Sequence, residues 1–138
     1  MTAEPTWLES RDTLPIHEEL QREFGGSAGL RDSGLFESAL GISRNHFVYG
    51  ERDHFRLAAA YAVALTRNHP FVDGNKRTPF MAAYVFLGVN GHDFQAREED
   101  VVRTMLLLAQ RKLSEEELSE WFRGSSVPAK GTKRRKKP

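Results

Sequence analysis

Residues 53–68 read DHFRLAAAYAVALTRN, and this stretch does more than any other to decide the fold. The segment is rich in alanine and leucine and is apolar on more than one side, which is typical of a helix buried at the centre of a domain. Asp53 is the expected cap of its first turn. The other elements are therefore expected to pack around this helix.

Upstream of the central segment, the spacing of apolar residues predicts two helices. Ile16, Leu20 and Phe24 fall four residues apart, on one face of an amphipathic helix over residues 14–24 that ends at Gly25-Gly26. The segment GLRDSGLFESAL predicts a second, shorter helix, with Asp32 or Ser33 as its cap. Residues 44–52 show no clear period, and we expect an exposed loop or a short hairpin there.

Downstream of residue 68, three further helices are expected. The first covers about residues 76–90, with Pro79 in its first turn, where the missing N–H has no helical partner to lose. The second covers residues 98–112, and a Ser114–Glu117 capping box opens the last. Six helices with almost no strand pattern predict an all-α bundle, with one domain over residues 1–124 and a disordered basic tail over residues 125–138.

Composition excludes several classes of protein. The 138 residues contain no cysteine, so disulfides, thiolate metal sites and cysteine nucleophiles are all ruled out. No apolar run is long enough to span a bilayer, and we expect a cytoplasmic protein without membrane contact. Six of the positive charges fall in residues 130–138, so the remainder of the chain carries a net charge of about −5. We therefore do not expect nucleic-acid binding, although the tail alone would allow it.

The segment HPFVDGNKR, residues 69–77, concentrates chemically useful side chains between two helices. Gly74 and Asn75 can adopt backbone conformations that turn successive N–H groups into one concavity at the start of the next helix, where anions bind. Lys76 and Arg77 add two positive charges beside it. These features together predict a site for a nucleotide polyphosphate.

Two further residues of the segment supply groups for a transfer reaction. Asp73 offers a hard oxygen ligand for Mg²⁺, and His69 can accept a hydroxyl proton near neutral pH. Taken singly, each group has an ordinary interpretation: His69 as a helix terminus, residues 73–75 as a turn, and the two cations as solvated. Together they favour group transfer from a nucleotide.

HPFVDGNKR resembles the signature of the Fic/Doc family, and its lysine before the final arginine is similar to the Doc (death-on-curing) branch. The resemblance extends over about residues 16–123. It implies His69 as general base, Asp73 as the Mg²⁺ ligand, and Phe71 as the anchor of the loop in the core. It also implies phosphate binding by four consecutive residues and an upstream helper: Gly74, Asn75, Lys76, Arg77 and Arg67. The segment around residues 47–50 resembles the family's flap, which aligns a target by strand-like pairing.

The same resemblance implies a reaction and partners. Doc-like chains transfer a phosphoryl group from ATP to a threonine of elongation factor EF-Tu and are neutralised by a Phd-type antitoxin. Members that transfer AMP have a second glycine where this chain has Lys76, so we expect a toxin kinase that inhibits translation. An AMP transferase is the first alternative. A non-catalytic Fic-shaped module that binds a peptide is the second.

Overall fold

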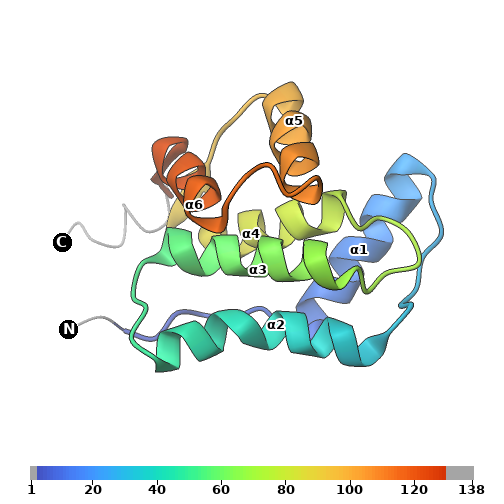
Figure 1. Ribbon diagram of the computed structural model, residues 1–138, viewed down its shortest axis with the longest axis horizontal. Helices are drawn as coiled ribbons and strands as arrows, with labels where there is room; N and C mark the ends of the chain where they lie inside the picture. The colour runs from blue at the N-terminus through green and yellow to red at the C-terminus, as the bar shows by residue number, and fades with distance from the viewer. Residues whose placement is uncertain (1–2, 130–138) are drawn as a thin grey trace.

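The computed structural model describes residues 3–129, and these form six α-helices and one small antiparallel sheet (Figure 1). The expected all-α class is therefore confirmed. None of the helices within residues 3–129 is both long enough and apolar enough to cross a membrane. In chain order the elements are α1 (Ser10–Phe24), α2 (Ser33–Val48), α3 (His54–Asn68), α4 (Arg77–Val89), β1 (His92–Phe94), α5 (Glu98–Ala109), α6 (Glu115–Gly124) and β2 (Ser126–Pro128).

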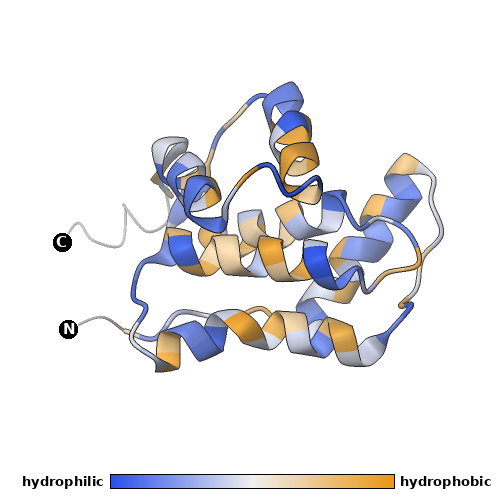
Figure 2. Cartoon of the chain, in the orientation of Figure 1, coloured by the Kyte–Doolittle hydropathy of each residue, from blue (hydrophilic) through white to orange (hydrophobic). Residues whose placement is uncertain are grey.

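Helix α3 occupies the centre of the molecule, as its sequence predicts. Asp53 is its cap, with one carboxylate oxygen accepting the N–H of Phe55 at 2.8 Å. Helices α2, α4 and α6 pack around it, and every residue from Leu57 to Val63 is buried. Figure 2 shows polar residues at both ends of α3 and apolar residues along its middle. The small alanine side chains allow neighbouring helices to approach closely, so residues 57–63 of α3 form the centre of the core.

Helix α1 buries a different face from the one that its apolar spacing indicates. Its buried residues are Thr13, His17 and Gln21, while Phe24 is 44% exposed. On this face the ring of His17 stacks on Phe71 of the loop after α3 and contacts Thr78 of α4, while the side chains of Thr13 and Gln21 donate to the carbonyls of Glu9 and Ser27. The helix also begins earlier than expected, at Ser10, where Glu9 and Asp12 form a capping box.

Helix α2 is longer than expected, and the prediction of a loop or hairpin at residues 44–52 is wrong for residues 44–48, which are helical. Asp32 caps the helix by accepting the N–H of Leu35 at 2.9 Å, and the helix continues to Val48. The expected flap at residues 47–50 is therefore a helix end and a tight turn. It lies at the opposite end of α3 from residues 69–77 (Figure 1).

The downstream helices follow the sequence closely. Pro79 lies in the first turn of α4, and Ser114 and Glu117 form the capping box that opens α6. Strand β2 pairs with β1, from His92 opposite Pro128 to Phe94 opposite Ser126. Residues 126–128 thus belong to the folded domain rather than to a tail. Residues 130–138 lie outside the described residues, so a disordered basic tail there stays a prediction.

Candidate active site

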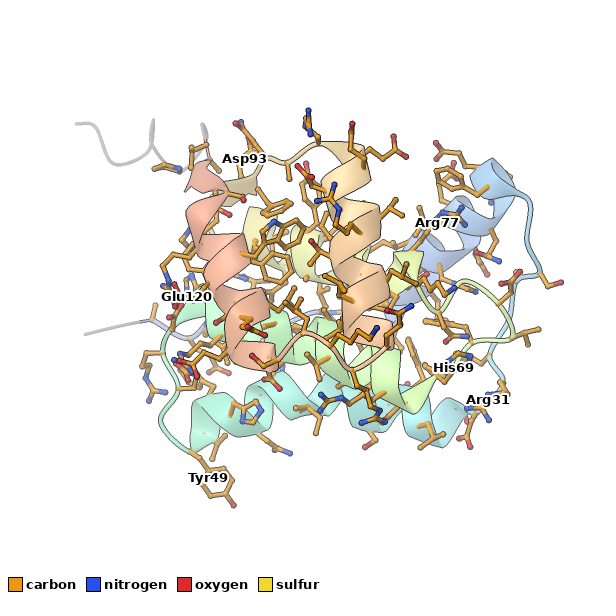
Figure 3. All side chains as sticks on the ribbon, turned by 45° about the horizontal axis from the view of Figure 1, so that its top comes forward. Arg31, Tyr49, His69, Arg77, Asp93 and Glu120 are labelled. Atoms are coloured by element: carbon orange, nitrogen blue, oxygen red, sulfur yellow. The ribbon has the colours of Figure 1, made fainter. Side chains whose placement is uncertain are left out.

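A cavity of about 570 Å³ opens between the loop after α3, the start of α4 and one face of α5. Residues 72–77 and His69 line one side, and the other side is apolar, including Val101 and Met105 of α5. Six of the predicted site residues therefore surround one cavity: His69, Asp73, Gly74, Asn75, Lys76 and Arg77. Arg67 is exposed and is not among the lining residues. Figure 3 labels His69 and Arg77 at this end of the molecule.

His69 ends α3 in an unusual backbone conformation. It is the C-cap residue, with φ 51° and ψ 53°, in the left-handed region that residues other than glycine and asparagine rarely adopt. Its N–H donates to the carbonyl of Leu65 at 3.2 Å, and its side chain is exposed at the cavity. The imidazole is thus available to an incoming hydroxyl.

Below the loop, Phe71 and Asn75 hold its shape. Phe71 is fully buried, and its ring stacks on His17 with centroids 4.0 Å apart. The side-chain amide of Asn75 spans the loop: its Oδ1 accepts the N–H of Phe71 at 3.1 Å and its Nδ2 donates to the carbonyl of Phe71 at 2.9 Å. The predicted anchoring by Phe71 agrees with this burial. The amide of Asn75 is engaged within the loop, so its contribution to the site is the shape of the backbone.

Gly74 is required by both backbone conformation and space. Its φ of +86° is in the region that favours glycine. A Cβ atom at this position would lie 2.5 Å from Oε1 of Gln21 and 2.9 Å from Cε1 of His17. The loop therefore passes directly over the buried polar face of α1.

Helix α4 begins at the cavity without an acidic cap. Lys76 is the N-cap residue, makes no capping hydrogen bond through its side chain, and is followed by no acidic residue in the first turn. The free N–H groups and positive dipole end of a helix favour an anion at such a point. Neither Lys76 nor Arg77 forms an ion pair within residues 3–129, and the Arg77 guanidinium lies 4.1 Å above the Phe24 ring. The charges at this helix start therefore favour an anion.

Asp73 is the one carboxylate among the cavity-lining residues. Its Oδ1 accepts the N–H of Gly74 at 2.8 Å, and its Oδ2 lies close to Gly26, where a Cβ atom would be only 2.6 Å away. The part of the chain that the structure describes contains no cluster of three or more His, Asp or Glu side chains that could hold a metal. A single carboxylate fits Mg²⁺, which takes its remaining ligands from water and substrate phosphates.

His17 supports the loop from beneath. Its Nδ1 is 3.0 Å from Oγ1 of Thr78, while its buried Nε2 has no hydrogen-bond partner among the described residues. Burial lowers the pKa of His17, although the carboxylates of Asp73 and Glu18 oppose this effect. The ring is therefore neutral near pH 7, and its role is to pack beneath the loop.

Arg31 is a further residue at the site, and no pattern in the sequence marks it. Its guanidinium donates from Nε to the carbonyl of His69 at 2.9 Å, and it reaches the carbonyl of Asn68 through Nη2 at 3.2 Å. Only the structure identifies it, because its segment pairs with the site loop: Leu30 forms an isolated antiparallel bridge with Phe71.

Known proteins match the part of the chain that contains this cavity-lining loop. The sequence profile of the Fic/DOC family matches residues 7–87, which is more than half of the chain. "Toxin Doc" of Mycolicibacterium smegmatis is 42% identical over 87 residues, covering 57% of this chain and 66% of that protein. "Protein kinase doc" of Escherichia phage P1 is 34% identical over 85 residues, covering 61% and 68%. The chain spans about two thirds of the length of each relative.

Proposed function

The chain belongs to the Fic/DOC family, and from this premise we propose that it is a Doc-like toxin that transfers the γ-phosphoryl group of ATP to a threonine or serine hydroxyl of a translation protein. One observation carries the proposal. A helix start without an acidic cap, two unpaired cations and an exposed histidine all face one cavity. Elongation factor EF-Tu is the proposed target, so the toxin would act in the cytoplasm.

The residues of the cavity can each take one part of the reaction. The backbone N–H groups of Lys76 and Arg77, with the cations of their side chains, would bind the phosphates, because the N–H of Thr78 already donates to the carbonyl of Gly74. His69 would accept the proton of the target hydroxyl, whose oxygen bonds to the γ-phosphorus as the bond to the β-phosphate oxygen breaks and ADP leaves. Asp73 would hold Mg²⁺, which neutralises phosphate charge when bound.

Two observations favour phosphoryl transfer over AMP transfer. Lys76 places an ammonium group and a long side chain at the start of α4, where a glycine would leave the backbone open. The phage P1 relative is named as a protein kinase. AMP transfer and peptide binding without catalysis are the outcomes against which the proposal is tested.

Labelled ATP separates these reactions. The purified protein, incubated with Mg²⁺ and EF-Tu, should transfer the label from γ-labelled ATP and not from α-labelled ATP, and His69→Ala should abolish the transfer. Incorporation of the α label would identify an AMP transferase instead. Growth arrest by both the wild type and His69→Ala, with no label transferred, would indicate a binding module.

A second cavity supports the proposal of a Phd-type antitoxin as partner. This cavity, of about 510 Å³, is lined mainly by apolar side chains of α1, α4 and α5 and shares Arg77, Phe80, Val101 and Val102 with the first. Tyr84 on its rim is 37% exposed. A segment of antitoxin lying along this apolar surface would cover the nucleotide site at the same time.

Tyr84 provides the test of this partner, because it lines the second cavity and not the first. Tyr84→Ala should weaken binding of the antitoxin encoded beside the toxin gene by about tenfold or more, since aromatic side chains dominate apolar interfaces. Transfer of the γ label should continue. Unchanged antitoxin affinity would place the partner on another surface.

A further inference from the structure

The left-handed conformation of His69 needs support from outside α3. Its φ of 51° is unfavourable for a residue with a Cβ atom. The proline that follows adds to the cost, because a residue before proline is driven towards extended conformations. Conformations of this kind persist only where surrounding contacts over-determine them. The contacts that do so identify the groups that aim the imidazole.

Arg31 makes most of these contacts. Its Nε and Nη2 donate to the carbonyl of His69 at 2.9 and 2.5 Å, and Nη2 also reaches the carbonyl of Asn68. These carbonyls belong to the C-terminus of α3, where the last carbonyl groups lack helical partners and a cation is favoured. The guanidinium therefore holds the peptide planes on either side of the turn.

The backbone of Arg31 fixes the next residue as well. Its N–H donates to the carbonyl of Pro70 at 2.7 Å, and the N–H of Asp32 donates to the same oxygen at 3.2 Å. Asp32 in turn caps α2, which packs against α3. One residue thus holds two consecutive carbonyls of the site loop while it is itself anchored to a core helix. Figure 3 shows Arg31 beside His69.

We propose that Arg31 is the positioning residue of the transfer reaction: its guanidinium fixes the left-handed turn at His69 and so presents the imidazole to the target hydroxyl. This inference rests on the proposed function. Arg31 does not line the cavity, so it would act only through His69. Its loss should lower kcat and leave nucleotide binding largely intact.

Arg52 offers a matched control. It also places a guanidinium on carbonyls at a helix end, those of Phe47 at 2.7 Å and Glu51 at 3.2 Å, but at the end of α2 remote from the cavity. Arg31→Ala should reduce kcat by about 10- to 100-fold, the range expected when a supporting contact or an ångström of alignment is lost. KM for ATP should change less than about threefold, and Arg52→Ala should leave both constants unchanged.

Two further measurements keep the test decisive. Arg31→Lys retains the charge and should recover part of kcat. It also replaces Arg31→Ala in the test if that variant folds poorly. In NMR spectra, the backbone chemical shifts of residue 69 should report a positive φ in the wild type and its loss in Arg31→Ala. Unchanged shifts of residue 69, or parallel losses of kcat and melting temperature in both alanine variants, would overturn the inference. If the wild type transfers no group, the proposed function fails, and the NMR comparison alone decides the role of Arg31.

Discussion

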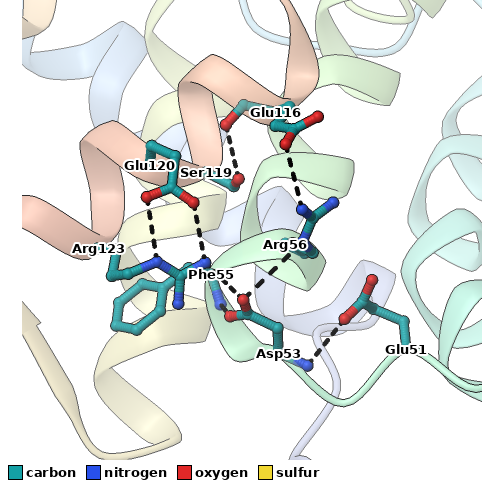
Figure 4. A network of polar contacts seen from close by, with 8 residues as sticks. All are labelled: Glu51, Asp53, Phe55, Arg56, Glu116, Ser119, Glu120 and Arg123. Atoms are coloured by element: carbon teal, nitrogen blue, oxygen red, sulfur yellow. Dashed lines mark hydrogen bonds and ion pairs between the residues drawn. The ribbon is translucent and has the colours of Figure 1, made fainter.

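Helices α3 and α4 begin in opposite ways. At the start of α3, Asp53 caps the first turn and accepts a bond from Arg123, which also contacts Glu120 (Figure 4). At the start of α4, a lysine occupies the cap position and no acid follows in the first turn. The α3 start thus carries its own anion, whereas the α4 start leaves that place open beside a cavity. The α4 start therefore has the features that favour an anion, which is why we propose it as the nucleotide site, whereas the α3 start is satisfied by the protein's own side chains.

The largest effect is expected from the histidine beside the α4 start. His69→Ala should lower transfer by about 10²- to 10⁴-fold, because the general base is removed. The melting temperature should hold, since the side chain is exposed. His46 is an exposed histidine at the far end of α2, and His46→Ala should retain full transfer. Equal losses in the two variants, measured by transfer of the γ label, would remove His69 from the chemistry.

A change of charge at the start of α4 should affect ATP binding, whereas a change of charge at the start of α3 should affect only stability. Lys76→Asp supplies the missing anion at α4, so ATP affinity should fall by about tenfold or more as a charge-assisted contact is replaced by repulsion. The same change should raise the free energy of unfolding by up to about 1 kcal/mol, through the helix dipole. Calorimetric titration with ATP and urea unfolding measure the two effects.

Asp53→Asn is the reciprocal change. It removes the charge that pairs with Arg123 and should lower the free energy of unfolding by about 1 kcal/mol or less, because both side chains are partly exposed. ATP affinity should stay the same. A loss of ATP binding in this variant would show that the two helix starts are not separate in function.

Gly74→Ala tests whether the loop that leads into α4 has room for any side chain. The added Cβ would meet Gln21 and His17 in a backbone conformation that disfavours alanine. We expect a loss of about 1–3 kcal/mol in the free energy of unfolding, with ATP binding reduced as the loop shifts. Gly41 lies in α2 with nothing within 4 Å of its Cβ position, and Gly41→Ala is the control that should be neutral or stabilising. Equal stability in the two variants would contradict the close approach at Gly74.

Acidification should first lower the free energy of unfolding through two histidines inside the helical domain. Burial lowers the pKa of His54 despite the nearby carboxylate of Asp53, and burial also lowers that of His17. Below about pH 6.5 the unfolded chain binds protons that the folded chain resists, so the free energy of unfolding should be level above this pH and fall beneath it. Urea unfolding from pH 7.5 to 5 measures the slope, and His54→Gln should reduce it. An unchanged slope in that variant would exclude His54 as a cause.

At still lower pH the carboxylate of Asp53 should lose its contribution to the free energy of unfolding. Burial raises the pKa of Asp53, but hydrogen bonds from Arg123 and the N–H of Phe55 outweigh it and hold that pKa below its ordinary value. The stability from this carboxylate is therefore complete above about pH 4 and is lost as the pH falls through the folded-state pKa. In Asp53→Asn this final loss should be absent, and its persistence there would assign it to other groups.

Elements with local chemistry were predictable from the sequence. The Asp53 cap, the alanine-rich α3 and the Ser114–Glu117 capping box depend on residues close together in the chain, and all three are confirmed. The end of α2 was not predictable, because the buried stripe continues through Ser43, a polar residue that donates to the carbonyl of Leu57 and breaks the apolar pattern.

The site divides in the same way. The polar part of its lining, His69 and residues 73–77, lies in one contiguous motif that the sequence predicts, whereas the apolar part comes from Phe80 of α4 and from α5. Its supports come from α1 and from the segment before α2: Arg31 contacts His69 across 38 positions of sequence, and His17 contacts Thr78 at the start of α4 across 61. Periodicity cannot reveal such contacts, and on α1 it indicated the wrong face.

The most direct test of the central claim is an NMR titration of the wild-type protein with ATP and Mg²⁺, following the backbone amides of both helix starts. Binding of the polyphosphate at the start of α4 should shift the amides of residues 74–78 and leave those of residues 53–56 unchanged. Shifts confined to other surfaces, or no shift at millimolar nucleotide, would contradict the claim that this helix start is the nucleotide site.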